Sequence, residues 1–189
     1  MMNSPAKWTP AKTGLVTALT AVACLGTLFV RIPIPITTGY FNVGDVFVIL
    51  AALWLGPTAG LIVGALGPAA ADAIGYPQFI LATAVTKGCE GLVVGLIAKG
   101  ARSNSRRLVA ATIGAAVMVA GYFVFEAFVY PVLARRIPFF DVTTMEGAIS
   151  ELLPNTIQGV IAVVVGLGLF RAIASGGTGS PGSVAPIRS

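Results

Sequence analysis

The sequence predicts an all-α fold, an integral membrane bundle of six transmembrane helices with both termini cytoplasmic. Two observations support this prediction. First, 56% of the 189 residues are hydrophobic and only 10% are charged, with a mean hydropathy of +0.91. A soluble domain carries about 25% charged residues, so this composition suits lipid as the solvent. Second, six long apolar segments alternate with loops that contain Gly, Pro or basic residues.

Residues that break helices set the boundaries of these segments. Two prolines, Pro33 and Pro35, follow the first segment and prevent its continuation. Gly56 precedes Pro57, which is well placed to begin the third segment. Hydropathy then gives six spans, at about residues 13–30, 43–55, 57–74, 79–98, 108–131 and 147–170.

The second and third spans are short, because crossing a bilayer takes about 20 helical residues. The third also contains Pro68. Short or interrupted membrane helices usually line a cavity. A simple proline kink is the alternative explanation of the same pattern. We expect the membrane domain to span residues 13–174 and a cytoplasmic N-terminal segment, residues 1–12, to precede it. The tail at 175–189 is rich in Gly, Ser and Pro and is expected to be disordered.

Basic residues in the loops predict the orientation. Placing both termini inside puts eight Lys and Arg residues on the inner side and three on the outer side, which satisfies the positive-inside rule. The inner set is Lys7, Lys12, Lys99, Arg102, Arg106, Arg107, Arg171 and Arg188, and the outer set is Arg31, Arg135 and Arg136.

Several kinds of chemistry are missing from the sequence. Histidine is absent, which removes histidine-dependent catalysis and imidazole metal sites. There is no phosphate-binding loop of the Gly-x-x-x-x-Gly-Lys-Ser/Thr type, and no basic stripe with interleaved aromatics for nucleic acid. Cys24 and Cys89 lie inside apolar segments, so no structural disulfide is expected. We therefore expect no enzyme, no cofactor, no metal and no nucleic-acid partner.

Charged and polar residues nevertheless occur inside the spans, where a charge costs a few kcal/mol. With the predicted topology they fall in the outer half of the bilayer, so they suggest a small-molecule site there. The candidate binding residues are Lys87, Glu90, Glu126, Asn155, Gln158, Asn42, Tyr40, Asp72 and Tyr76. Tyr40 and Phe41 lie in a loop that could cover such a site, although aromatics such as Tyr76 also suit the membrane interface.

Each of these groups has a structural alternative. Lys87 and Glu90 share a helix face at i, i+3 and could pair with each other or open toward a ligand. Glu126 has no partner in its own helix, so it must be protonated, pair across helices or face water. Asp45 and Asp72 could cap helices at the membrane interface or could contribute to a binding site. Asn155 and Gln158 suit either interhelical hydrogen bonds or ligand contacts.

Small residues spaced four apart predict close helix contacts. The pairs are Gly14/Ala18, Thr17/Ala21, Gly60/Gly64 and Gly91/Gly95.

An ordered series of motifs resembles a known family. These are residues 39–45 (Gly-Tyr-Phe-Asn-Val-Gly-Asp), 55–57 with Gly60, Ala71-Asp72, 75–77, and 87–91 (Lys-Gly-Cys-Glu-Gly). Over about residues 13–170 the chain resembles the substrate-binding S components of energy-coupling factor (ECF) vitamin transporters, in the riboflavin or hydroxymethylpyrimidine subgroup. The resemblance implies a multi-pass protein of a prokaryotic cell membrane that captures a small heterocyclic vitamin-like ligand from outside.

The resemblance also implies partners: a membrane coupling (T) subunit and two ATPases, in addition to the lipid bilayer. S components usually dock through small residues of the first helix. In this chain the residue four positions after Ala18 is Val22, which is not small. The docking face would therefore have to use the pair Gly14/Ala18 or the pair Thr17/Ala21. The ligand remains open among a pyrimidine, a pyridoxine-like compound, a deazapurine and a flavin. A self-sufficient proton- or ion-coupled carrier and a membrane scaffold are the alternative functions.

Overall fold

The computed structural model describes residues 8–34, 37, 39–140 and 143–176. Most of residues 1–12 and of the tail 175–189 lie outside these residues, so the predictions for both segments stay untested. The elements in chain order are α1 (Pro10–Phe29), β1 (Ile32–Pro33), β2 (Tyr40–Phe41), α2 (Gly44–Leu55), α3 (Pro57–Gly75), η1 (Pro77–Phe79), α4 (Ile80–Ala98), α5 (Asn104–Val124), η2 (Phe125–Val129), α6 (Tyr130–Ala134), η3 (Pro138–Phe140) and α7 (Met145–Gly176).

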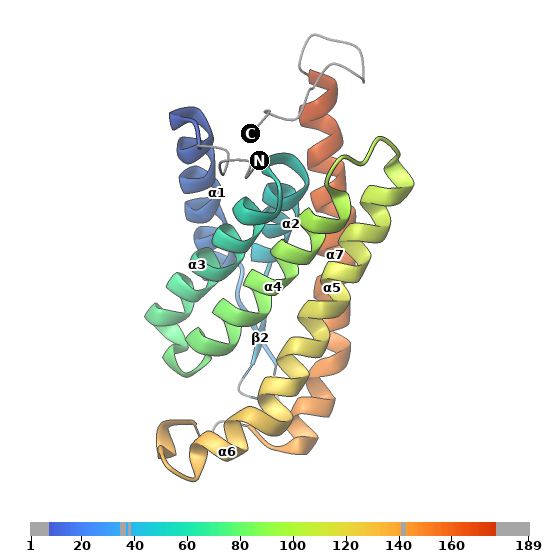
Figure 1. Ribbon diagram of the computed structural model, residues 1–189. Coiled ribbons are helices and arrows are strands. Elements are labelled where there is room, and N and C mark those ends of the chain that lie inside the picture. The colour runs from blue at the N-terminus through green and yellow to red at the C-terminus, as the bar shows by residue number, and fades with distance from the viewer. Residues whose placement is uncertain (1–7, 35–36, 38, 141–142, 177–189) are drawn as a thin grey trace, which may run out of the picture.

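The helices form one bundle around the short helix α2. This helix packs against α1, α3, α4 and α7, while α5 lies against α4 and α7 (Figure 1). Helix α1 begins and α7 ends at the same end of the bundle, and α6 lies at the opposite end. Because nine of its twelve residues are buried, α2 serves as the core of the bundle.

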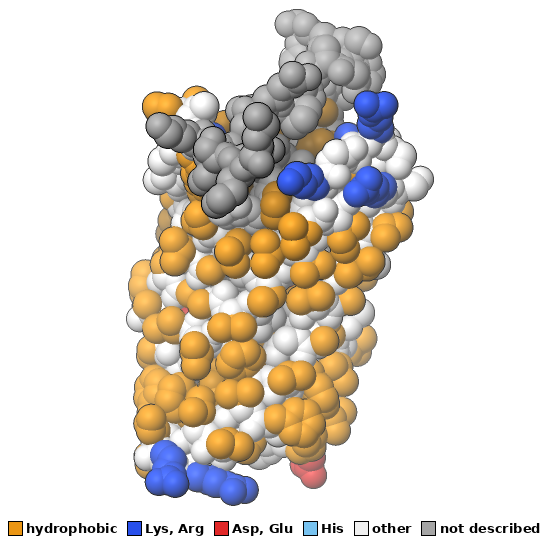
Figure 2. Space-filling view, in the orientation of Figure 1, with side chains coloured by type: hydrophobic (Ala, Val, Ile, Leu, Met, Phe, Trp, Pro, Cys, Tyr) orange, Lys and Arg blue, Asp and Glu red, His pale blue; other side chains and the backbone are white. Residues whose placement is uncertain are grey.

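The outer surface between the two ends is apolar. Large hydrophobic side chains stay exposed on the helices, among them Phe29, Ile74 and Leu153. Figure 2 shows these hydrophobic side chains covering the middle of the molecule, with Lys and Arg side chains at its two ends. Within the described residues, five helices are long and apolar enough to cross a membrane, and α2 is a shorter apolar helix. The predicted all-α membrane bundle of six helices is confirmed.

Glycines let the helices approach closely where α3 crosses α4. A Cβ added at Gly60 would meet the backbone of Gly91, and one added at Gly64 would meet the carbonyl of Lys87. The close contacts predicted from these small-residue pairs are confirmed. The space around Gly14 on α1 is open, with no other atom within 4 Å of an added Cβ.

The prolines act differently from one another. Pro68 does not interrupt α3, which continues from Pro57 to Gly75. In the fifth span, by contrast, the α-helix changes at Phe125 into a π-helical turn that ends just before Tyr130 and Pro131. Proline cannot donate the hydrogen bond that a regular helix requires, so the turn widens ahead of it. Glu126 is buried within this π turn.

Candidate functional site

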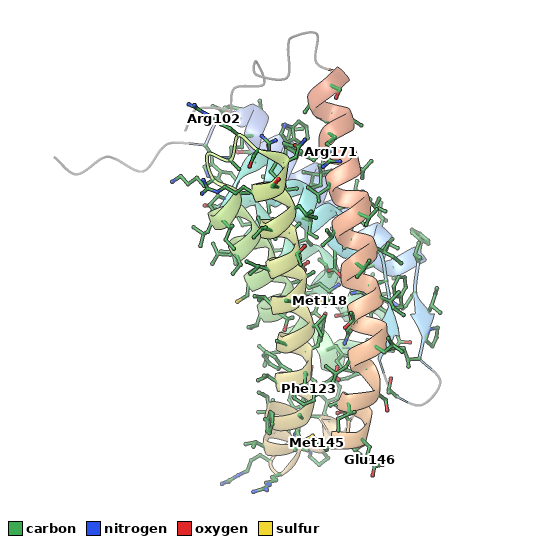
Figure 3. The ribbon with its side chains drawn as sticks, turned by 90° about the vertical axis from the view of Figure 1, so that its right-hand side faces the viewer. Arg102, Met118, Phe123, Met145, Glu146 and Arg171 are labelled. Carbon is green, nitrogen blue, oxygen red and sulfur yellow. The ribbon has the colours of Figure 1, made fainter. Side chains whose placement is uncertain are left out.

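A cavity lies in the half of the bundle away from the end of α7. It is bounded by the β2 segment, the start of α4, the end of the fifth span and the first half of α7. Its space is about 320 Å³, counted with its open mouth. Figure 3 shows α5 and α7 running side by side, with Met145 and Glu146 at this end. The lining residues are Gly39, Tyr40, Asn42, Phe79, Thr83, Tyr122, Glu126, Glu151, Asn155 and Gln158.

A buried polar network forms one side of this cavity. The ammonium of Lys87 lies 2.6 Å from Oδ1 of Asp45 and donates a hydrogen bond to Oδ1 of Asn42 at 3.2 Å. The amide of Gln158 donates to Asp45, while its Oε1 accepts the backbone N–H of Asn42 at 2.7 Å. The network therefore ties α2, α4 and α7 to the segment before α2. It also fixes the amide groups of Asn42 and Gln158 at the cavity wall.

The β1–β2 hairpin covers another side through Tyr40. The Tyr40 hydroxyl donates a hydrogen bond to the carboxylate of Asp72. Burial and the neighbouring Asp72 raise the pKa of Tyr40, so the hydroxyl stays protonated as the donor. Its ring lies 4.6 Å from the ring of Tyr76, and the Arg31 guanidinium stacks over both rings at 4.8 and 4.9 Å. Arg31 also donates to the carbonyl of Ala71 at 2.9 Å, which holds the hairpin against α3.

Two carboxyl groups stand on the remaining wall. Glu126 from the π turn and Glu151 from α7 are 2% and 5% exposed, and both line the cavity. Oε1 of Glu151 accepts the backbone N–H of Gly39 at 3.1 Å, which secures the hairpin. A Cβ at position 39 would meet this carboxylate, so a side chain there would require the Glu151 carboxylate to move. Oε2 of Glu126 has no hydrogen-bond partner among the described residues.

Of the predicted binding residues, five line this cavity. They are Tyr40, Asn42, Glu126, Asn155 and Gln158. The other four are not among the lining residues. Lys87 contacts the lining residue Asn42, Asp72 and Tyr76 contact Tyr40, and Glu90 is fully buried in α4.

For two sets of groups whose partners the sequence left open, the structure shows the partners. Lys87 forms its ion pair with Asp45 of α2 rather than with Glu90, because its long side chain reaches across the interface between α4 and α2. Asp45 and Asp72 are not surface caps, since both are 0% exposed. Each instead accepts a hydrogen bond from a side chain of another segment, Gln158 and Tyr40 respectively.

Some lining residues were not among the predicted ones. Glu151 shares a face of α7 with Asn155 and Gln158, at the i, i+4 and i+7 spacing that places residues on one side of a helix. That spacing could have identified it. Thr83 is likewise one turn before Lys87 on α4, and its hydroxyl hydrogen-bonds that of Tyr122 at 3.0 Å. Phe79, Tyr122 and Gly39 carried no signal beyond their position near the other groups.

The lining is suited to binding a small molecule. It offers amides, hydroxyls, carboxyls and aromatic rings, and the described residues contain no group of three or more Cys, Asp or Glu that could hold a metal ion. Such a mixture of aromatic rings and a few placed polar groups is typical of small-molecule sites.

Comparison with known proteins agrees with this fold. The family model described as "ECF-type riboflavin transporter, S component" matches residues 7–175. A protein of Pyrococcus woesei, described as an uncharacterized protein in the gap 3′ region, is 38% identical over 143 residues, which are 76% of this chain and 88% of that protein.

Two solved structures share the fold. One, described as the S component of a bacterial ECF transporter, has a TM-score of 0.69 at 21% identity and covers 87% of this chain and 96% of its own. The other, the S component for biotin from an ECF-type ABC transporter, has a TM-score of 0.50 at 17% identity over 88% of this chain and 95% of its own. The multi-pass membrane fold, the polar cavity and the family match lead to one assignment: this chain belongs to the ECF-type riboflavin transporter S component family.

Proposed function

We propose that this protein captures a vitamin or related small heterocycle with high affinity in the cavity beside Tyr40, for import driven by partner ATPases. The observation that carries the proposal is the cavity itself. Five polar residues predicted from the sequence meet there, from three separate parts of the chain.

The proposed direction of capture is from the external side. The cavity is in the half of the bundle opposite the end of α7. The end of the bundle where α7 finishes carries the exposed basic residues Lys99, Arg102, Arg106 and Arg171. Because basic residues favour the cytoplasmic side, this end would face the cytoplasm and the cavity would face outward. Labelling of single cysteines introduced at Arg102 and Arg135 tests this: a reagent that cannot cross the membrane should modify only the second.

The proposed partners are a membrane coupling subunit and two ATPases. The sequence has no phosphate-binding loop of its own, so energy must come from elsewhere. The predicted docking residues Gly14, Thr17, Ala18 and Ala21 are all exposed on α1. A face of small residues lets a second helix approach closely, which supports α1 as the docking helix.

Uptake and binding assays with one pair of variants test both parts of the proposal. Ala18→Leu should reduce uptake in cells that carry the ATPase module while the purified variant keeps its bound compound, because the added side chain blocks a helix contact. Ala116→Leu, an exposed alanine on α5, is the matched control and should transport normally. Uptake that persists without the ATPases would favour a self-sufficient carrier. Loss of binding in Ala18→Leu would instead place Ala18 within the protein's own packing.

A further inference from the structure

The carboxyl pair of the cavity wall gives information about the charge of the ligand. Glu126 and Glu151 reach the cavity from different elements, the π turn and α7, and both are almost completely buried. Among the described residues that line the cavity there are no Lys or Arg side chains. The lining therefore carries carboxyl groups without a cation of its own.

The nearby cations are already engaged. Lys87 forms the one salt bridge found among the described residues, and its partner is Asp45 rather than either cavity carboxyl. The Arg31 guanidinium donates to the carbonyl of Ala71 and stacks on Tyr40 and Tyr76 on the far side of the hairpin. Among the described residues, the cavity carboxyls thus have no cationic side chain as a partner.

Such an arrangement is costly unless a proton or another molecule completes it. A buried carboxylate needs a hydrogen-bonded or charged partner, and two adjacent ones repel each other. Glu151 has a partial partner in the backbone N–H of Gly39. Glu126 has none at Oε2, although this residue is 2% exposed and lines the cavity. The unpartnered oxygen marks the place where a donor from a ligand would bind.

Resting on the proposed function, we infer that the ligand is a cationic heterocycle, a flat ring that carries a protonated amine or amidine. The cationic group sits between Glu126 and Glu151 and donates to both. The ring lies among the aromatic side chains of Tyr40, Phe79 and Tyr122, and the amides of Asn155 and Gln158 bond to its polar atoms. A ring of this kind differs in charge from a neutral flavin, which would leave both carboxyls without a counter-ion.

The test compares matched compounds and matched variants of the full-length protein. The probes are an aminomethylpyrimidine, which is a cation at neutral pH, its neutral hydroxymethyl analogue, and riboflavin. The variants are Glu126→Gln, Glu151→Gln and the control Glu146→Gln, which changes an exposed carboxylate at the start of α7 (Figure 3). Calorimetric titration gives the affinities, and thermal melts without probe show that each variant folds. Mass spectrometry identifies any compound that co-purifies with the wild type.

The inference predicts that the wild type binds the aminomethyl probe at least roughly tenfold more tightly than either neutral probe. Glu126→Gln should then weaken that binding by roughly tenfold to a hundredfold, the range for losing a hydrogen bond to a charged group. Glu146→Gln should leave it unchanged, as should Glu126→Gln for the hydroxymethyl probe.

Other outcomes separate this inference from the function on which it rests. Tight binding of riboflavin or the hydroxymethyl probe, equal in wild type and Glu126→Gln, would overturn the cationic ligand and leave the capture function standing. If none of the probes binds, the co-purifying compound decides: a cation supports the inference and a neutral compound or anion contradicts it. A folded protein with no probe bound and no co-purifying compound would contradict the capture function itself.

Discussion

Replacing Lys87 with Met should destabilise the bundle strongly, because the substitution keeps the length of the side chain and removes its charge. The ammonium and the Asp45 carboxylate are 2.6 Å apart and essentially unexposed. With an effective dielectric constant of about 20, two unit charges at this distance attract by about 6 kcal/mol. Part of that attraction offsets the cost of removing both charges from water. Breaking one partner of such a buried pair typically costs about 3–5 kcal/mol.

A double-mutant cycle isolates the pair from the rest of the network. Asp45→Asn keeps an acceptor for the amide of Gln158. Adding this second change to Lys87→Met removes the buried uncompensated charge, so the double variant should recover about 2 kcal/mol or more of the loss. Reversible unfolding of the purified protein in detergent, followed by circular dichroism, measures the four free energies. Additive effects of the two substitutions would refute the ion pair as the stabilising contact. They would then favour some other partner for Lys87.

Two further substitutions test the packing and the hairpin. Gly91→Val should destabilise the purified protein by about 1–3 kcal/mol, because the new side chain meets the backbone of Gly60 and forces α3 from α4. Gly14→Val, where the space is open, should leave the melting temperature unchanged, and equal effects of the two would contradict the close crossing. Tyr40→Phe removes the donor to the buried Asp72 and should cost about 1–3 kcal/mol. Faster release of bound compound in stopped-flow measurements would accompany it, whereas unchanged release would separate Tyr40 from the closure of the cavity.

The sequence was sufficient to predict the fold, because each membrane helix appears in it as a continuous apolar segment. It also indicated the layer of the site, since charges such as Glu126 are too costly in lipid to be there without a role. Depth along a helix follows from counting residues at 1.5 Å each. Tyr40 was instead predicted from a loop that could cover the site, and Asn42 lies in the same loop, within the motif at 39–45.

The pairing of side chains could not be obtained from the sequence. Lys87 and Glu90 share a face of α4, and the local spacing makes them the natural pair. The packing of α2 against that face brings Asp45 to the ammonium at 2.6 Å instead. How each helix is rotated about its axis relative to its neighbours depends on the whole bundle, and single-helix patterns do not contain it. The π turn that buries Glu126 is a further case, because it depends on how the chain relaxes ahead of Pro131.

A structure of the protein with its co-purifying compound bound, determined in a lipid nanodisc by cryo-electron microscopy with a bound antibody fragment, tests the central claim most directly. The account predicts density for the compound within the cavity, in hydrogen-bond contact with Glu126 and with the amide of Asn155 or Gln158. Density for the compound elsewhere in the bundle, with no contact to Glu126 or Glu151, would contradict it.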